Sequence, residues 1–106
     1  MVRDNIPNIL ESKGINHGFK IIEEKEKISF LKKKLDEEVK EVKIELKNNN
    51  KTKIIEELAD VLEVIDALSN CFGFELSDII NIKKQKAIEK GGFNKGIVLL
   101  FTEEKE

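Results

Sequence analysis

Two stretches with apolar residues at helical spacing constrain the fold of this chain more than any other feature. The first covers residues 24–47, where apolar side chains recur at steps of three and four, as on one face of an α-helix. They are Ile28, Leu31, Leu35, Val39, Val42 and Leu46. The second runs to about Phe72, and its main face is Ile54, Leu58, Val61, Ile65, Leu68 and Phe72, flanked by Ile55 and Leu62 on one side and by Val64 and Cys71 on the other. A helix that is apolar over most of its circumference is largely buried, so these stretches predict an all-α fold.

Turn residues predict two further helices and therefore a compact bundle of about four. One lies near the start and ends at Gly14, and the other ends at the glycines at 91 and 92. Asp4, Thr52 and Ser77 are the predicted N-caps. The short apolar segments 18–23 and 96–101 are expected to be extended, and they could pair as a small hairpin.

Length and charge limit the function classes that this chain could serve. We expect residues 1–106 to form one domain. Lys and Arg total 19 against 21 for Asp and Glu, a net charge of −2, which argues against a nucleic-acid partner. The longest apolar run, 97–101, is too short to span a membrane. A single cysteine indicates a reduced, cytoplasmic protein. So small a domain gains stability by self-association, so we expect an oligomer.

Acidic residues occur beside both apolar faces, although carboxylates usually lie on the solvent-exposed side of a helix. Glu38 and Glu41 follow Lys34 along the edge of the first face, whereas Glu57 and Asp60 lie inside or at the margin of the second. The alternative interpretation is a solvated flank with Lys–Glu pairs one turn apart. If the helices pack antiparallel, however, the four carboxylates can converge, and charges about 4 Å apart near a protein surface repel by about 4 kcal/mol. A hard divalent cation, Mg²⁺ or Mn²⁺, would relieve this repulsion.

The same acids carry a resemblance to a known family. "EEVKE" (37–41) and "EELAD" (56–60) resemble the Glu-x-x-Glu … Glu-x-x-Asp signature of the MazG-like all-α nucleoside triphosphate pyrophosphatase superfamily. "VRDNIP" (2–7) and "KAIEKGGF" (86–93) resemble its phosphoribosyl-ATP pyrophosphohydrolase-like subgroup. The resemblance implies that the metal ligands are Glu38, Glu41, Glu57 and Asp60 and that the chain forms a homodimer or homotetramer.

The expected activity is Mg²⁺-dependent hydrolysis of a nucleoside triphosphate to the monophosphate and pyrophosphate, as in the house-cleaning of non-standard nucleotides. Glu38 and Glu41 are the candidate catalytic residues, and which carboxylate accepts the proton of the attacking water stays open. Lys34, Lys83 and Lys86 are candidates to hold phosphates. Arg3 and Asp4 are assigned to tying down the first helix, with reach to the site as the alternative. Two other functions stay open: hydrolysis of phosphoribosyl-ATP itself, and a non-enzymatic helical interaction module.

Overall fold

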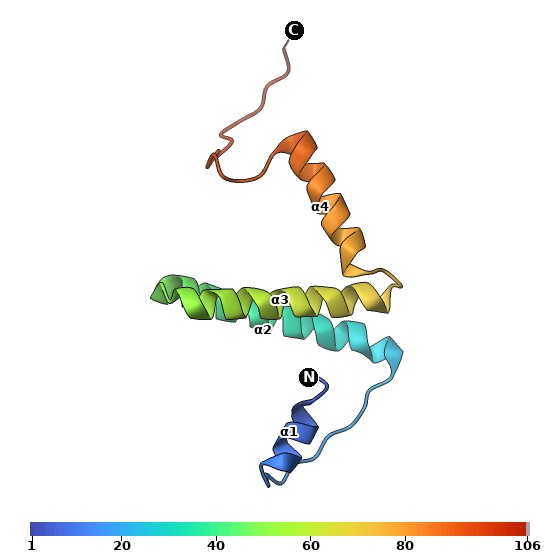
Figure 1. Ribbon diagram of the computed structural model, residues 1–106. Helices are drawn as coiled ribbons and strands as arrows, with labels where there is room; N and C mark the ends of the chain where they lie inside the picture. Colours follow the sequence, from blue (N-terminus) through green and yellow to red (C-terminus); the bar gives the residue numbers. More distant parts are fainter. Residues whose placement is uncertain (106) are drawn as a thin grey trace. The chain divides into compact units, whose positions relative to one another are not determined.

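The computed structural model describes residues 1–105, and every regular element among them is an α-helix. The helices are α1 (Ile6–Ser12), α2 (Glu24–Asn48), α3 (Lys51–Cys71) and α4 (Leu76–Lys90) (Figure 1). The prediction of an all-α fold with about four helices is therefore confirmed. None of these helices combines the length and the apolar composition needed to cross a bilayer.

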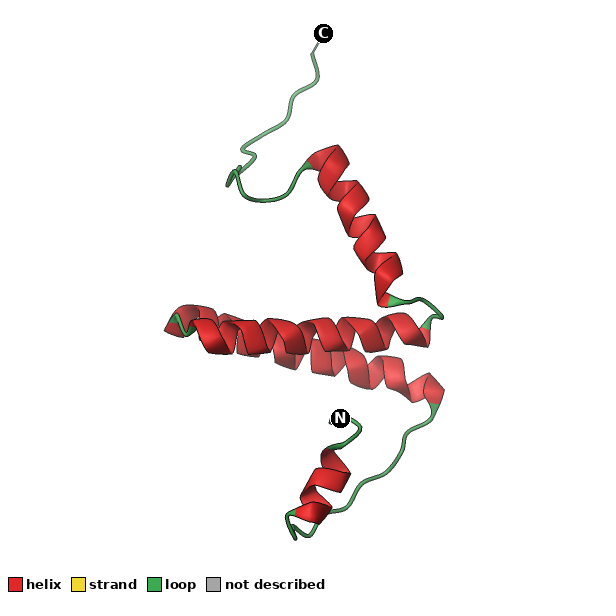
Figure 2. Cartoon of the chain, in the orientation of Figure 1, coloured by secondary structure: helices red, strands yellow, loops and turns green. Residues whose placement is uncertain are grey.

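Helices α2 and α3 lie side by side as an antiparallel pair, joined by a turn of only two residues (Figure 2). Asn49 adopts the left-handed conformation (φ 54°), and its backbone N–H donates to the carbonyls of Glu45 and Leu46 at the end of α2. The Asn50 side chain then accepts a hydrogen bond from the Lys53 backbone N–H. Asn50, and not the predicted Thr52, is thus the N-cap of α3, because it stands before the first turn and Thr52 already lies in it.

The best-buried side chains belong to the α2–α3 pair. Leu31 of α2 and Val64 of α3 are each only 6% exposed, and Ser69 is buried with its hydroxyl donating to the Ile65 carbonyl at 2.8 Å. The buried side of α3 is rotated from the predicted centre toward the Val64 and Cys71 flank. Leu58 and Phe72, which were predicted to be central, are 51% and 59% exposed. Ile54, Val61, Ile65 and Leu68 are half-buried as predicted, so the apolar residues of α3 that stay exposed lie to one side of the packed face.

Helix α1 begins at Ile6, one residue later than an N-cap at Asp4 would place its start. Asn5 occupies the N-cap position without a side-chain hydrogen bond, so the prediction of Asp4 as the cap is wrong. Pro7 lies in the first turn, where its missing N–H costs nothing. Gly14 follows the helix at φ +69°, a conformation that glycine adopts without strain, and so ends α1 as predicted.

The chain divides into two compact units, Met1–Leu76 and the part from Ser77 onward. Helix α4 begins at Leu76, the last residue of the first unit, so Ser77 lies within the helix and is not its cap. No strand occurs in residues 1–105, and the predicted strands at 18–23 and 96–101 and their hairpin are wrong. A strand needs hydrogen-bond partners for its backbone N–H and C=O groups. Both segments are instead solvent-exposed, with Ile21 88% and Leu100 87% exposed. That residues 1–106 form one domain stays a prediction.

Candidate active site

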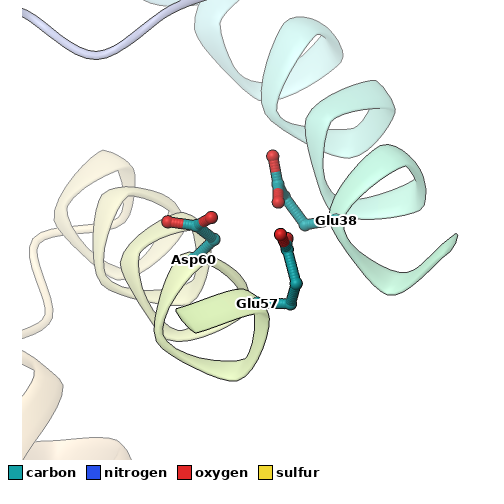
Figure 3. A group of neighbouring side chains, drawn as sticks. All are labelled: Glu38, Glu57 and Asp60. Carbon is teal, nitrogen blue, oxygen red and sulfur yellow. The ribbon is translucent and has the colours of Figure 1, made fainter. Parts of the chain in front are cut away.

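Three carboxylates from the α2–α3 pair point toward one another (Figure 3). Glu38 comes from α2, and Glu57 and Asp60 come from α3. One carboxylate oxygen of each residue lies within 4.8 Å of the other two, and all three side chains are half-buried. The cluster therefore belongs to the packed side of the helix pair and not to its solvated surface.

Helix geometry explains why these acids meet. Glu57 and Asp60 are three residues apart, so they project from the same side of α3 on successive turns. That side also carries Val64, which is buried, and the antiparallel packing brings Glu38 of α2 to the same level. The prediction that Glu57 and Asp60 lie at the margin of the apolar face agrees with their burial.

Glu41, the fourth predicted ligand, lies outside this cluster. It is exposed on α2, one turn beyond Glu38, and its oxygens are not among those within 4.8 Å. Its negative charge nevertheless reaches Glu57, as does that of Glu45. The role of Glu41 as a ligand stays a prediction.

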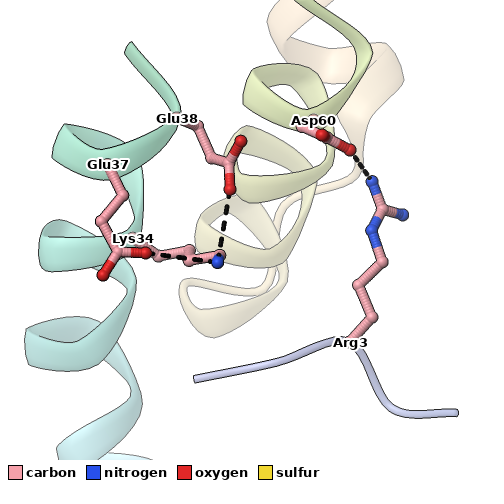
Figure 4. A network of polar contacts seen from close by, with 5 residues as sticks. All are labelled: Arg3, Lys34, Glu37, Glu38 and Asp60. Carbon is pink, nitrogen blue, oxygen red and sulfur yellow. Dashed lines mark hydrogen bonds and ion pairs between the residues drawn. The ribbon is translucent and has the colours of Figure 1, made fainter. Parts of the chain in front are cut away.

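Two cations neutralise part of the cluster (Figure 4). The Lys34 ammonium group lies 3.3 Å from Glu38 and also donates to Glu37 at 3.3 Å. The Arg3 guanidinium donates to Oδ1 of Asp60 at 2.5 Å. Glu57 has no cationic partner among residues 1–105, so it is the one member of the cluster whose charge is not compensated.

The pKa shifts reflect this arrangement. The pKa of Glu57 is raised above that of an ordinary glutamate, first by desolvation and then by the negative charges of Asp60 and Glu38. Partial burial lowers the pKa of Lys34, but hydrogen bonds to Glu37 and Glu38 outweigh burial and raise the pKa overall. Lys34 therefore stays protonated at neutral pH, while Glu57 bears the electrostatic strain of the cluster.

A cavity of about 880 Å³ opens beside the carboxylates. Its walls are the N-terminal segment, α1, α2 and α3, all within the unit Met1–Leu76. Arg3, Lys34, Glu38 and Asp60 line it together with apolar side chains that include Leu31 and Val64. A mostly apolar cavity with a few convergent charges is the usual form of a small-molecule site, and this volume lies within the range of about 300–1,000 Å³ typical of such sites.

The donor set fits a hard divalent cation. Three carboxylates supply only oxygen ligands, which suits Mg²⁺ or Mn²⁺ better than zinc. Two oxygens on one Mg²⁺, each about 2.1 Å away, are at most about 4.2 Å apart. The observed limit of 4.8 Å thus requires only a small rotation of the side chains.

The remaining predicted phosphate ligands lie elsewhere in the chain. Lys83 and Lys86 are exposed on α4, in the second unit, and their role stays a prediction. Arg3, in contrast, was assigned to holding down the first helix, yet it contacts Asp60 in the cluster. The sequence feature that could have indicated a role for Arg3 in the site was its place in "VRDNIP", one of the four stretches that carry the family resemblance.

A comparison with family models agrees with the resemblance. The model of the MazG nucleotide pyrophosphohydrolase domain matches residues 26–91, a range that contains Glu38, Glu57 and Asp60 but begins after Arg3. No curated protein and no solved structure matches the chain. The resemblance to the superfamily is thereby confirmed, and the assignment to its phosphoribosyl-ATP pyrophosphohydrolase-like subgroup stays a prediction.

Proposed function

Since the chain belongs to the MazG nucleotide pyrophosphohydrolase family, we propose that it hydrolyses the bond between the α- and β-phosphates of a nucleoside triphosphate. The products are the nucleoside monophosphate and pyrophosphate, and the reaction depends on Mg²⁺, with Mn²⁺ as a substitute. The observation that carries the proposal is the convergence of Glu38, Glu57 and Asp60 within the matched range.

In this proposal Glu38, Glu57 and Asp60 hold the divalent ion, and Glu41 joins them from the next turn of α2. When bound, the ion neutralises phosphate oxygens and lowers the pKa of the attacking water. Glu38 and Glu41 are the proposed catalytic carboxylates, which orient that water and take up its proton. Because Glu57 has no cationic partner in residues 1–105, it has the most to gain from a bound ion.

The phosphates of the substrate need cations of their own. Lys34 lines the cavity beside Glu38, and its raised pKa keeps it charged, so we assign it to the phosphate chain. We assign Lys83 and Lys86 of α4 to the same role on the resemblance alone. The apolar lining of the cavity, which includes Leu31 and Val64, would accept the base or the sugar.

We further propose a cytoplasmic homo-oligomer, a dimer or a tetramer, that removes non-standard nucleotides. The support is the side of α3 that carries Ile55, Leu58, Leu62 and Phe72, each between 47% and 70% exposed. Large apolar side chains grouped in this way usually mark an interface. A non-enzymatic interaction module would use the same surface. Dependence on a divalent metal distinguishes the two functions, because only the enzyme requires the ion.

Pyrophosphate release from a panel of nucleoside triphosphates tests the activity. Glu38→Gln and Asp60→Asn should each lower turnover about 100-fold or more, since charge stabilisation of this kind is worth about 2.7–4 kcal/mol in enzymes. Asp36→Asn on α2 and Glu56→Gln on α3 are matched controls, because both acids are exposed and outside the cluster. Full activity in both site variants would overturn the assignment. Turnover of phosphoribosyl-ATP alone would favour the biosynthetic reaction.

A further inference from the structure

The contact between Arg3 and Asp60 links positions 57 residues apart in the sequence. Arg3 precedes α1, in the segment that forms one wall of the cavity, and Asp60 lies on α3. The contact therefore joins the N-terminal segment to the carboxylate cluster itself (Figure 4). Because the family match begins at residue 26, Arg3 stands outside the part of the chain that the family defines.

The charges of the cluster are nearly balanced without a metal ion. Glu38, Glu57 and Asp60 carry three negative charges, and Lys34 and Arg3 supply two positive charges next to Glu38 and Asp60. A divalent ion would bring the same amount of positive charge to the same carboxylates. Like charges at this separation repel, so the ion and the two side-chain cations compete for the cluster.

Arg3 can leave the carboxylate cluster more easily than Lys34 can. The Lys34 side chain is 28% exposed and is held by Glu37 as well as by Glu38, whereas the Arg3 side chain is 57% exposed and has the single partner Asp60 in residues 1–105. Only the backbone carbonyl of Arg3 bonds to the first helix, where it accepts from the Ile6 N–H at 3.1 Å, so the guanidinium can move without breaking that bond. The cation that the metal displaces with least cost is therefore Arg3.

We propose that Arg3 is an exchange cation: it holds Asp60 in the metal-free protein and transfers to the phosphate chain of the substrate when metal and nucleotide enter together. This inference rests on the proposed function. The planar guanidinium can donate two parallel hydrogen bonds to phosphate oxygens. Arg3 and Lys34 line the same cavity as Glu38 and Asp60, so phosphates that approach the cluster meet both cations.

The exchange predicts opposite effects of one substitution on two ligands. Arg3→Gln removes the competitor of the metal, so Mn²⁺ alone should bind about 3- to 10-fold more tightly. The same variant lacks a phosphate ligand, so the 1:1 complex of Mn²⁺ with inorganic tripolyphosphate should bind about 10-fold or more weakly. Arg3→Lys keeps the charge but not the paired donors, so it should leave Mn²⁺ binding near wild type and still weaken the complex.

Isothermal titration of the full chain with each of the two ligands tests the exchange. Lys20→Gln is the matched control, because it removes one exposed positive charge from the same N-terminal region without touching the cavity. It should bind both ligands as the wild type does. Circular dichroism of each variant confirms that the helices are retained.

The outcomes distinguish failure of the Arg3 exchange from failure of the proposed function. If the wild type binds Mn²⁺ and Arg3→Gln leaves both affinities unchanged, or weakens both, Arg3 is only a structural tie and the exchange is wrong. A wild type that binds Mn²⁺ but not the tripolyphosphate complex also overturns the exchange. If neither protein binds Mn²⁺, the carboxylates are not a metal site, and the proposed function fails with the inference.

Discussion

Two sides of α3 each depart from the usual amphipathic pattern. The side toward the cluster contains Glu57 and Asp60, both half-buried, next to the buried Val64. The adjoining side presents Ile55, which is 70% exposed, and Leu58, which is 51% exposed. In an ordinary amphipathic helix the carboxylates would face water and these apolar residues would be covered.

Each side is therefore incomplete in a single chain, and each lacks a different thing. The carboxylates need positive charge, which Arg3 and Lys34 supply only in part. The apolar side needs a cover, which we assign to another copy of the chain. Charge buried on one side and apolar surface left open on the other are separate requirements, and different experiments can test them separately.

The largest effect is expected on the apolar side. Leu58→Lys should weaken self-association about 100-fold or more, because it removes about 1.5–3 kcal/mol of apolar burial and adds an unpaired charge. Analytical ultracentrifugation across a range of concentrations measures this change. Glu56→Gln, which changes the net charge by the same +1 on the polar side of α3, should leave the assembly unchanged. A wild type that sediments as a monomer at all concentrations would show that the predicted homo-oligomer is wrong.

Local features of the fold were predictable from the sequence. The limits of α2 and the meeting of Glu38, Glu57 and Asp60 follow from helical periodicity and a short connection, which are properties of neighbouring residues. The side of α3 that packs within the chain was not predictable, since Leu58 and Val64 lie on adjoining parts of one broad apolar surface. Periodicity places residues around a helix but does not choose among several apolar sectors.

Features that depend on distant partners were missed for a related reason. The segments 18–23 and 96–101 have strand-like composition, but a strand also needs a pairing partner, which composition does not supply. Arg3 reaches Asp60 across 57 positions, and no local rule relates the two. The sequence therefore left the reach of Arg3 to the site as an alternative, and the N-terminal wall of the cavity became visible only in the structure.

A smaller effect is expected on the carboxylate side. Because the pKa of Glu57 is raised in the folded state, the protonated form favours folding, and that contribution is lost as the pH rises through the raised pKa. In EDTA, Glu57→Gln should therefore melt at a higher temperature than the wild type at neutral pH. The difference should shrink as the pH falls toward the ordinary range of glutamate. Thermal melts followed by circular dichroism between pH 4 and pH 8 measure it, and a variant that is less stable at neutral pH would contradict the strain assigned to Glu57.

A thermal melt in EDTA and in MgCl₂ decides whether Glu38, Glu57 and Asp60 form a divalent-metal site. With Mg²⁺ at about 100 times its dissociation constant, the wild type should gain about 2.7 kcal/mol. For a domain of this size that gain corresponds to a rise of about 10 °C or more in Tm. Asp60→Asn should show little or none of this rise, while Glu56→Gln should show all of it. Identical wild-type melts in EDTA and Mg²⁺, or an equal rise in Asp60→Asn, would contradict the account.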